Sequence, residues 1–450
     1  MSKLLMQCTV CVFMFLLIHA CSSSDQEINT DNDTETETDP EPDPDINASP
    51  NVMLIIADDM GLDASPGYGI GNIKPNMPNL QNMINSGVIF NNVWSNPTCT
   101  PTRAGIITGK YGFRTGVTKV GDQLSTTETS LQQYIDNNVA SPYNHAVIGK
   151  WHISNEPTHP NTMGVDYYAG LLTGSLSSYY DWNITINGAT ETSTEYNTTQ
   201  LTDLAIDWVN NQSTPWFLWL SYNAAHTPFH LPPDELHSQG TLSNDDASID
   251  ANPIPYYMAM LEAMDSEFGR LLDTMSDTEK ENTVFIFVGD NGTPRKVVQE
   301  YIGSKGKGTV YQGGINVPMI ISGKNVLRKG STEEALINTT DLFATIADIV
   351  GINSVEINDS KSFKNLLSTT DDTIKREFVF TEIGNDDGGA DYAIRNTTHK
   401  YILFDDDTEA LYNLSEDPFE ELNLMDQIPI SDLDATMLEE LTTELSTIQN

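Results

Sequence analysis

A cysteine, a proline and an arginine stand at alternate positions within residues 96–116, and together they could form a reactive site. Cys99, Pro101 and Arg103 have the spacing C-x-P-x-R, and Thr108 and Gly109 follow. Proline fixes its own φ angle, and we expect the arginine in the first turn of a helix, so a thiol would be held beside a fixed positive charge. The alternative is a buried structural cysteine near an ordinary helix start, which is the commoner role of a lone cysteine.

Two apolar runs end in acidic or amide side chains. Residues 51–57 are continuously apolar, which suits a central strand of a parallel sheet, and Asp58 and Asp59 follow directly. A second run, TVFIFV, precedes Asp290 and Asn291. If the two strands are parallel neighbours, four oxygen ligands converge at one sheet edge, and such a set suits Ca²⁺. One aspartate alone could be a turn or cap residue, but two adjacent carboxylates repel each other and a bound cation relieves the repulsion.

Basic and imidazole side chains follow two further predicted strands. Residues 144–152 indicate a short strand ending in G-K-W-H, and Lys150 and His152, two positions apart, share a face of an extended chain. Another apolar run at 215–222 precedes His226. Each histidine could be a structural residue. Their position just beyond strand ends, where ligands bind in open α/β sheets, makes them equally candidates for chemistry.

The formal net charge is −42, which argues against nucleic acid as a partner. Solubility in a salty environment is the simplest reason for such acidity. The basic residues are nevertheless concentrated in or beside the motifs: Arg103, Lys110, Arg114, Lys119, Lys150, Arg295, Lys296, Lys305 and Lys307. The last two lie in a glycine-rich segment, 303–318, that could cradle an anion or be a flexible loop. Basic residues retained in an acidic chain indicate a site that receives an anion.

The N-terminal residues predict export and a lipid anchor. The largely apolar run of 17 residues after Lys3 is short for a membrane span and suits an export signal. It ends at Cys21, which is followed by three serines, as in a bacterial lipoprotein processing site; a plain secretory signal cut nearby is the alternative. We predict a lipoprotein signal peptide at 1–21, lipidation of Cys21, and a disordered acidic tether at 22–49. The protein would then be anchored at the outer membrane, at the cell surface or in the periplasm of a Gram-negative bacterium.

Cys99 is the one free thiol that we expect in the mature body. Of the four cysteines, Cys8 and Cys11 lie in the predicted signal peptide, and Cys21 would carry lipid. An exported protein with a single thiol cannot form an internal disulfide, so this thiol serves reactivity better than structure.

The remaining pattern predicts two folded parts. Buried strands and helical segments such as 256–275 alternate up to about residue 370, and short alternating strands followed by a helix at 431–448 come after it. We therefore predict an α/β catalytic domain at 50–370, with a mostly parallel sheet flanked by helices, and a small antiparallel α+β subdomain at 371–450.

Together, these motifs resemble those of the formylglycine-dependent sulfatases of the alkaline-phosphatase-like superfamily. They comprise the strand ending in Asp58-Asp59, C-T-P-T-R with T-G, G-K-W-H, A-A-H-T-P, G-D-N-G and G-K-G-T, in the order found in the family. The resemblance implies an alkaline-phosphatase-like fold and the activity of a sulfuric ester hydrolase. It also implies that a formylglycine-generating maturation enzyme oxidises Cys99 to 3-oxoalanine (formylglycine), whose hydrate is the nucleophile.

The resemblance assigns a role to each candidate residue. A Ca²⁺ ion would be held by Asp58, Asp59, Asp290, Asn291 and the modified Cys99. Lys150 and Lys307 would bind sulfate oxygens, and Arg103 would stabilise the hydrated aldehyde. His152 would act on the second hydroxyl of that hydrate, and His226 would face the leaving oxygen.

The chemistry of sulfate esters agrees with these roles. Charge on several sulfate oxygens must be neutralised before a nucleophile reaches sulfur, and two lysines and a divalent cation supply that. An aldehyde hydrate has one hydroxyl that attacks and a second whose deprotonation expels sulfate, which explains why cysteine is only the precursor. Two residues depart from the family pattern without carrying a catalytic role: Gln312 replaces the usual Glu of E-G-G, and Asn316 replaces an Arg common before x-Pro.

These observations predict an exported, lipid-anchored sulfatase that acts on a sulfated polysaccharide or its oligosaccharides, such as ulvan or carrageenan of marine algae. One alternative is a phosphate or phosphonate monoester hydrolase of the same superfamily. Another is a non-catalytic surface glycan-binding lipoprotein, which would have no need of Cys99 or of acidic residues at two strand ends.

Overall fold

The apolar runs of the sequence form the middle of a large sheet. The computed structural model describes residues 49–370 and 376–450. Among these, one sheet has ten strands in the order β10-β2-β9-β8-β1-β7-β3-β4-β5-β6. The strands are β1 Asn51–Ala57, β2 Val88–Trp94, β3 Asn144–Gly149, β4 Tyr167–Gly170, β5 Trp182–Ile186, β6 Ala189–Ser193, β7 Trp216–Ser221, β8 Thr283–Gly289, β9 Met319–Gly323 and β10 Ser331–Asn338.

The centre of this sheet is parallel. Strand β1 pairs in parallel with β7 and β8, β3 with β4 and β7, and β2 with β10, whereas β9 and the β5–β6 hairpin pair antiparallel. Ala57 of β1 pairs with Gly289 of β8, so the residues that follow them leave the sheet at the same level. The expectation that these two strands are parallel neighbours is confirmed.

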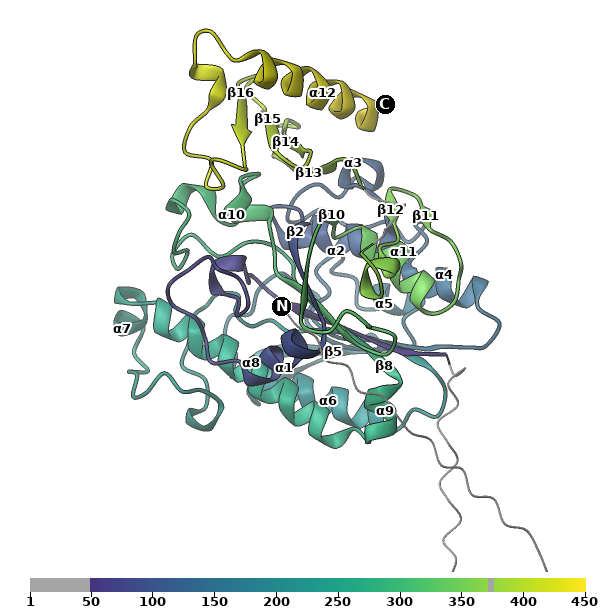
Figure 1. Cartoon of the computed structure of the whole chain (residues 1–450). Helices are drawn as coiled ribbons and strands as arrows, with labels where there is room; N and C mark the ends of the chain where they lie inside the picture. The colour runs from purple at the N-terminus through teal and green to yellow at the C-terminus, as the bar shows by residue number, and fades with distance from the viewer. Residues whose placement is uncertain (1–48, 371–375) are drawn as a thin grey trace, which may run out of the picture. The chain divides into compact units, whose positions relative to one another are not determined.

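Helices cover both faces of the sheet, as a buried parallel sheet requires. Three long helices lie on one face and three on the other (Figure 1). The first set is α1 Pro78–Ser86, α6 Asn197–Asn210 and α8 Ile254–Thr274, and the second is α2 Cys99–Thr108, α4 Leu131–Asn138 and α11 Asp341–Ile349. Alternate residues of β1 serve the two layers: Met53 and Ile55 pack with the first set, and Val52 and Leu54 with the second.

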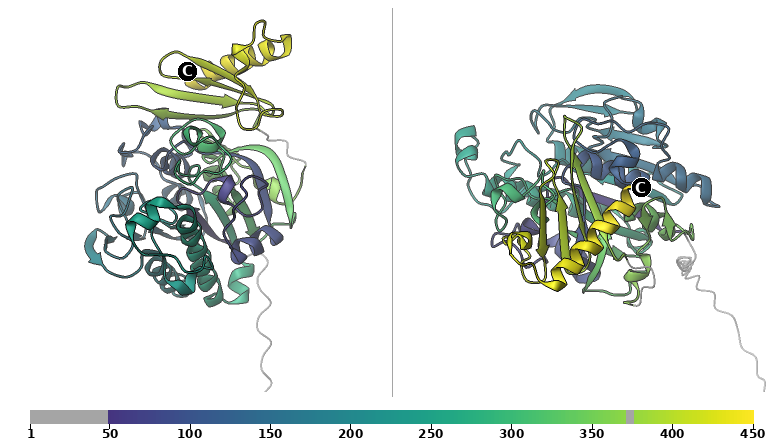
Figure 2. Two further views of the ribbon diagram at one scale, coloured as in Figure 1. Left: turned by 90° about the vertical axis from the view of Figure 1, so that its left-hand side faces the viewer. Right: turned by 90° about the horizontal axis from the view of Figure 1, so that it is seen from above.

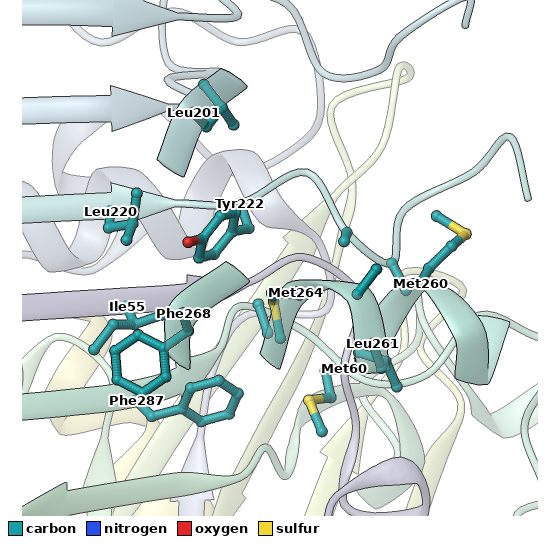
Figure 3. Packing of buried hydrophobic residues seen from close by; sticks show 14 of the residues in the cluster. Ile55, Met60, Leu201, Leu220, Tyr222, Met260, Leu261, Met264, Phe268 and Phe287 are labelled. Carbon is teal, nitrogen blue, oxygen red and sulfur yellow. The ribbon is translucent and has the colours of Figure 1, made fainter. Parts of the chain in front are cut away.

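Aromatic and aliphatic side chains close the space between the sheet and α8. Figure 3 shows Phe268 of α8 beside Ile55 of β1 and Phe287 of β8, with Met264 and Leu261 farther along the helix. All five are buried, and a fully buried side chain of this size contributes roughly 1.5–3 kcal/mol relative to an exposed one. This packing fixes α8 against the two strands whose ends carry the acidic residues.

A second, four-stranded antiparallel sheet follows, in the order β13-β14-β15-β16, with α12 on one face (Figure 2). Leu441 and Leu445 of α12 pack against Ile394 and Tyr401 of this sheet. Its elements are β13 Val379–Gly384, β14 Ala390–Arg395, β15 His399–Leu403, β16 Glu409–Asn413 and α12 Asp432–Gln449. The shorter elements of the chain are α3 Gly112–Thr115, α5 His159–Thr162, α7 Asp246–Ala251, α9 Asp277–Glu281, α10 Gln312–Ile315, β11 Glu356–Ile357 and β12 Ser360–Lys361.

The predicted fold class, an α/β main sheet with a small antiparallel C-terminal unit, is therefore confirmed. The boundary predicted between residues 370 and 371 adjoins 371–375, which lie outside the described residues. The same holds for the predicted signal peptide, the lipidated Cys21 and all but the last residue of the tether. Within the described residues, no helix combines the length and the apolar character that crossing a bilayer requires.

Candidate active site

Helix α2 places the cysteine at the carboxyl edge of the main sheet. The helix begins at Cys99, and Pro101 lies in the first turn, where the missing N–H costs no intrahelical bond. Gly109 ends the helix in the left-handed conformation, with φ of 65°, which glycine adopts without strain. Arg103 lies one turn after the cysteine and therefore on the same side of the helix. Both side chains are buried.

The acidic and amide residues that follow β1 and β8 meet beside this cysteine. The backbone N–H of Asp59 donates to Oδ1 of Asp290 at 3.1 Å, and Nδ2 of Asn291 donates to Oδ1 of Asp59 at 2.8 Å. The Cys99 sulfur and one carboxylate oxygen each of Asp58 and Asp290 lie within 4.8 Å of one another. The structure thus brings the five predicted metal ligands together in the interior.

Each of the three carboxylates is paired with a basic group. Lys150 Nζ donates to Oδ2 of Asp58 at 2.6 Å and lies 3.4 Å from the sulfur of Cys99. Lys307 Nζ donates to Oδ1 of Asp59. The third pair joins Arg103 to Asp290: Nε and Nη2 donate to Oδ2 at 3.1 and 2.8 Å. These pairs offset the cost of burying the six charges.

The two predicted histidines occupy different sides of the cysteine. His152 Nδ1 lies 3.1 Å from the Cys99 sulfur, and burial together with the charge of Lys150 lowers the pKa of His152, so its imidazole is neutral. His226 lies at the open side, where its Nε2 is 3.9 Å from Oδ2 of Asp59. Its Nδ1 is 2.7 Å from the Thr227 carbonyl. A carbonyl only accepts, so Nδ1 carries hydrogen and Nε2 is the atom that gains or loses a proton.

The protonation of the central groups follows from burial and from these pairs. Burial raises the pKa of Asp59, but Lys307 and His226 outweigh it and lower that pKa to about 2. Burial also raises the pKa of the Cys99 thiol, against the opposing effect of Lys150 and Lys307. An unmodified Cys99 is therefore a protonated thiol at neutral pH, and a protonated thiol is a poor nucleophile.

Two buried oxygens at this point accept no hydrogen bond from the described residues: Oδ1 of Asp58 and Oδ1 of Asn291. Buried polar atoms without partners are rare and costly. Both belong to predicted metal ligands, and carboxylate and carboxamide oxygens are the donors that Ca²⁺ takes. The residues present therefore fit a calcium ion.

The loop that carries Lys307 is held by the C-terminal sheet. Glu420, beyond β16, accepts a hydrogen bond from the backbone N–H of Gln312 at 2.7 Å, and its carbonyl accepts one from Lys305. The carboxylate of Glu420 also forms a fully buried ion pair with Lys400 of β15, at 2.5 Å. No motif in the sequence had indicated these contacts.

The two departures from the family pattern occupy interior positions. Gln312 Oε1 accepts a hydrogen bond from the Trp94 indole at 2.9 Å, and Asn316 Oδ1 accepts one from the backbone N–H of Val93 at 3.1 Å. Both side chains therefore attach the segment after Lys307 to the end of β2, away from the group around Cys99.

Sequence reasoning missed several residues that support the site. Ser221 Oγ accepts a hydrogen bond from Nη1 of Arg103 at 2.5 Å, and the Tyr257 hydroxyl donates to the carbonyl of Asp59 at 2.9 Å. Ser221 ends β7, so a polar residue closing an apolar run could have indicated it. Tyr257 lies within the regular pattern of α8, and nothing in the sequence distinguishes it.

Residues 50–352 match the family model described as Sulfatase. This chain belongs to the sulfatase family. Residues 303–447 of the sulfatase also match the model described as N-sulphoglucosamine sulphohydrolase, C-terminal, which includes the Lys307 loop and the second sheet. The predicted family is therefore confirmed.

Known proteins resemble this sulfatase over most of its length. The uncharacterized sulfatase YdeN of Escherichia coli (strain K12) is 28% identical over 363 residues, covering 68% of this chain and 63% of YdeN. A sulfatase of Formosa agariphila is 25% identical over 489 residues, covering 85% of this chain and 86% of its own. The crystal structure of Ps i-CgsB in complex with k-i-k-neocarrahexaose has a TM-score of 0.74 at 23% identity, covering 88% and 92% of the two chains, and shows that the fold is shared. The chain spans a little under two thirds of the length of YdeN.

Proposed function

We propose that this chain is an exported, lipid-anchored hydrolase of sulfate esters that acts on a sulfated polysaccharide or its oligosaccharides. The observation that supports the proposal best is the place of Cys99, between Lys150 and His152 and beside two buried oxygens that lack partners. The proposal includes conversion of Cys99 to formylglycine and binding of Ca²⁺ by Asp58, Asp59, Asp290, Asn291 and the modified residue 99.

When present, the calcium ion would neutralise charge on a sulfate oxygen, and the hydrate of formylglycine would supply the hydroxyl that attacks sulfur. The remaining task of the protein is electrostatic. In the ion pairs described above, three basic groups balance three carboxylates. A bound divalent cation therefore gives the site a net positive charge, which favours an anionic ester.

Lys150 and Lys307 are the groups that can reach sulfate oxygens. The ammonium group of Lys150 lies next to Cys99, and this side chain is fully buried. The ammonium group of Lys307 lies on the more open side of the carboxylates, and its side chain is 19% exposed. Arg103 is different, because Asp290, Ser221 and the Lys150 carbonyl take its hydrogen bonds. It therefore positions these neighbours and keeps a fixed positive charge beside residue 99.

The histidines divide the proton transfers. His152, neutral and in contact with residue 99, is placed to accept a proton from a group on that residue. His226 holds one hydrogen on Nδ1 and presents Nε2 on the open side, where the alcohol of the ester departs. It is placed to donate a proton to the leaving oxygen.

His226→Ala is expected to slow a sugar sulfate far more than a nitrophenyl sulfate. A sugar alkoxide needs a proton as the S–O bond breaks, whereas an acidic phenol departs nearly unaided, and general acid catalysis contributes about 10²–10⁴-fold. Values of kcat/KM for both substrates provide the measurement. His152→Ala serves as the control: because His152 would act after the alcohol has left, its loss should reduce kcat for both substrates to a similar rate. Equal losses on the two substrates in His226→Ala would show that another group is the acid.

The proposed substrate class follows from proteins that are similar to this one. Ps i-CgsB was crystallised with a neocarrahexaose, and the Formosa agariphila relative is a sulfatase aligned over most of both chains. Carrageenan or ulvan oligosaccharides are therefore the first substrates to assay. Sulfate and phosphate esters of one alcohol, compared side by side, separate a sulfatase from a phosphate or phosphonate monoester hydrolase. A non-catalytic glycan-binding lipoprotein would turn over neither.

We expect Cys21→Ser to release the protein from membranes. The change leaves the apolar export segment intact and removes only the thiol that would carry lipid. The partition of the protein between membrane and soluble fractions measures the effect. If the substituted protein stays with the membranes, the lipid anchor is refuted and the proposed chemistry is not affected.

A further inference from the structure

A cavity of about 260 Å³ lies beside the candidate active site. Its walls come from the segment 171–177, which follows β4, from Asn155 and from the β5–β6 hairpin. At ~30 Å³ per water molecule, the volume holds about eight waters, or one sugar ring in their place. None of the proposed catalytic roles uses this cavity.

The wall of the cavity is in direct contact with His152, and the chain just beyond it reaches His226. The carbonyl of Leu172 accepts a hydrogen bond from the backbone N–H of His152 at 3.1 Å. Gly174 covers the imidazole so closely that a Cβ atom there would lie 2.3 Å from Nε2 of His152. Farther along, the Tyr179 hydroxyl donates to the carbonyl of His226 at 2.8 Å. The stretch 171–179 therefore extends from one histidine to the other, and the cavity lies beside His152, which is in contact with residue 99.

The lining of the cavity contains no acidic, basic or histidine side chain. It consists of amides, hydroxyls, leucines, a proline and Trp182. Three of the polar side chains, those of Asn155, Ser175 and Ser177, are exposed and make no hydrogen bond with the described residues, and so are free to bind a ligand. Apolar surface with a few unpartnered polar groups is typical of a binding site.

This neutrality is unusual on a chain with a net charge of −42. Three other cavities of 240–410 Å³ each include a lysine in their lining. A carboxylate or a second sulfate placed in the neutral cavity would lose water without gaining a basic partner, which is costly. Hydroxyl groups, in contrast, could exchange water for the amide of Asn155 and the serine hydroxyls.

We propose that this cavity binds an uncharged, unsulfated sugar residue adjacent to the sulfated one. The inference rests on the proposed function, because a sulfated saccharide must occupy the neighbouring site. Sugar hydroxyls would bond to Asn155, Ser175 and Ser177, while the C–H faces of the ring would lie on Leu171 and Leu176. The cavity would thus select substrates whose sulfated unit has a neutral neighbour and disfavour those with a uronic acid there.

Calorimetric binding to the full-length Cys99→Ala protein with calcium tests the proposal independently of turnover. The probes are two disaccharides that share one sulfated galactose, the neighbour being galactose in one and glucuronic acid in the other. We expect the neutral disaccharide to bind about tenfold tighter or more. Asn155→Ala should weaken it about fivefold, the effect of one net hydrogen bond. Asn155→Lys should improve binding of the glucuronic acid probe, and Asn211→Ala, outside the cavity, should change neither.

Equal or tighter binding of the glucuronic acid probe would overturn the proposal. So would an unchanged dissociation constant for the neutral probe in both Asn155→Ala and the double variant Ser175→Ala, Ser177→Ala. Failure of the proposed function would appear elsewhere, as the absence of sulfate release from both disaccharides by the unsubstituted protein. The two failures are therefore distinguishable.

Discussion

Replacing Cys99 by alanine will lower kcat for sulfate esters about 10⁴-fold or more, with little change in stability. The side chain contributes one sulfur atom, yet it stands where Lys150, His152 and the carboxylates of Asp58 and Asp290 converge. Removing a nucleophile that works together with its neighbours costs almost the whole rate enhancement of the group. Since burial raises the pKa of the unmodified thiol, the sulfur itself is not the expected nucleophile. Loss of activity should therefore follow loss of the modification.

Mass spectrometry of the peptide that contains residue 99 provides the decisive companion measurement. An active preparation should contain the peptide without its sulfur, as an aldehyde. The melting temperature of Cys99→Ala, compared with that of the parent protein, shows that the fold is retained. Full activity in a preparation whose peptide contains only unmodified cysteine would refute the assignment.

Removal of calcium will abolish turnover and lower the melting temperature. Without the ion, Oδ1 of Asp58 and Oδ1 of Asn291 remain buried with no partner. An ion that binds only the folded state stabilises it by about 2.7 kcal/mol at a concentration 100 times its Kd. Melting curves and initial rates, recorded in excess calcium and again after chelation, measure both effects.

Asp58→Asn tests the same calcium site by changing one of its proposed ligands. The substitution keeps the size of the side chain but removes a negative charge next to Lys150, so kcat should fall by about 10²–10³-fold. The rise in melting temperature on adding calcium should also become much smaller. Asp277→Asn, whose side chain is 99% exposed, is the matched control and should leave the calcium effect intact. If chelation changes neither the rate nor the melting temperature of the parent protein, no calcium site exists.

The acidic part of this site could be predicted because its residues follow strand ends, whereas Cys99 and Arg103 lie on α2 and were indicated by their spacing. The run before Asp58 and the run before Asp290 are apolar after their first residue, so both strands follow from composition. The common level at which they end follows from their pairing. The parallel pairing of β1 and β8 was an inference from the matching chemistry at their ends. It proved correct because the carboxyl edge of a parallel sheet gathers whatever follows its strands.

The sequence did not predict the elements and contacts that lack a regular pattern of apolar residues. The β5–β6 hairpin lies at the sheet edge, and most of β6 is exposed, so no apolar pattern marks it. Tyr257 and Glu420 meet the site through packing between segments far apart in the chain. Contacts of this kind form only in the complete fold, and a motif of adjacent residues does not indicate them.

The hydrogen bonds between Glu420 and the Lys307 loop set an order in which the parts of the site are made during translation. Lys307 lies in the connection between β8 and β9 of the main sheet, but the groups that hold its loop, Lys400 of β15 and Glu420 after β16, come later in the chain. A ribosome makes all ten strands of the main sheet before it makes either residue. A nascent chain can therefore bury Cys99 and its carboxylates while the lysine loop is still unsecured. The loop that carries Lys307 is secured last, so a chain that ends before Glu420 would carry the other site residues while this loop lacks its hydrogen bonds to Glu420.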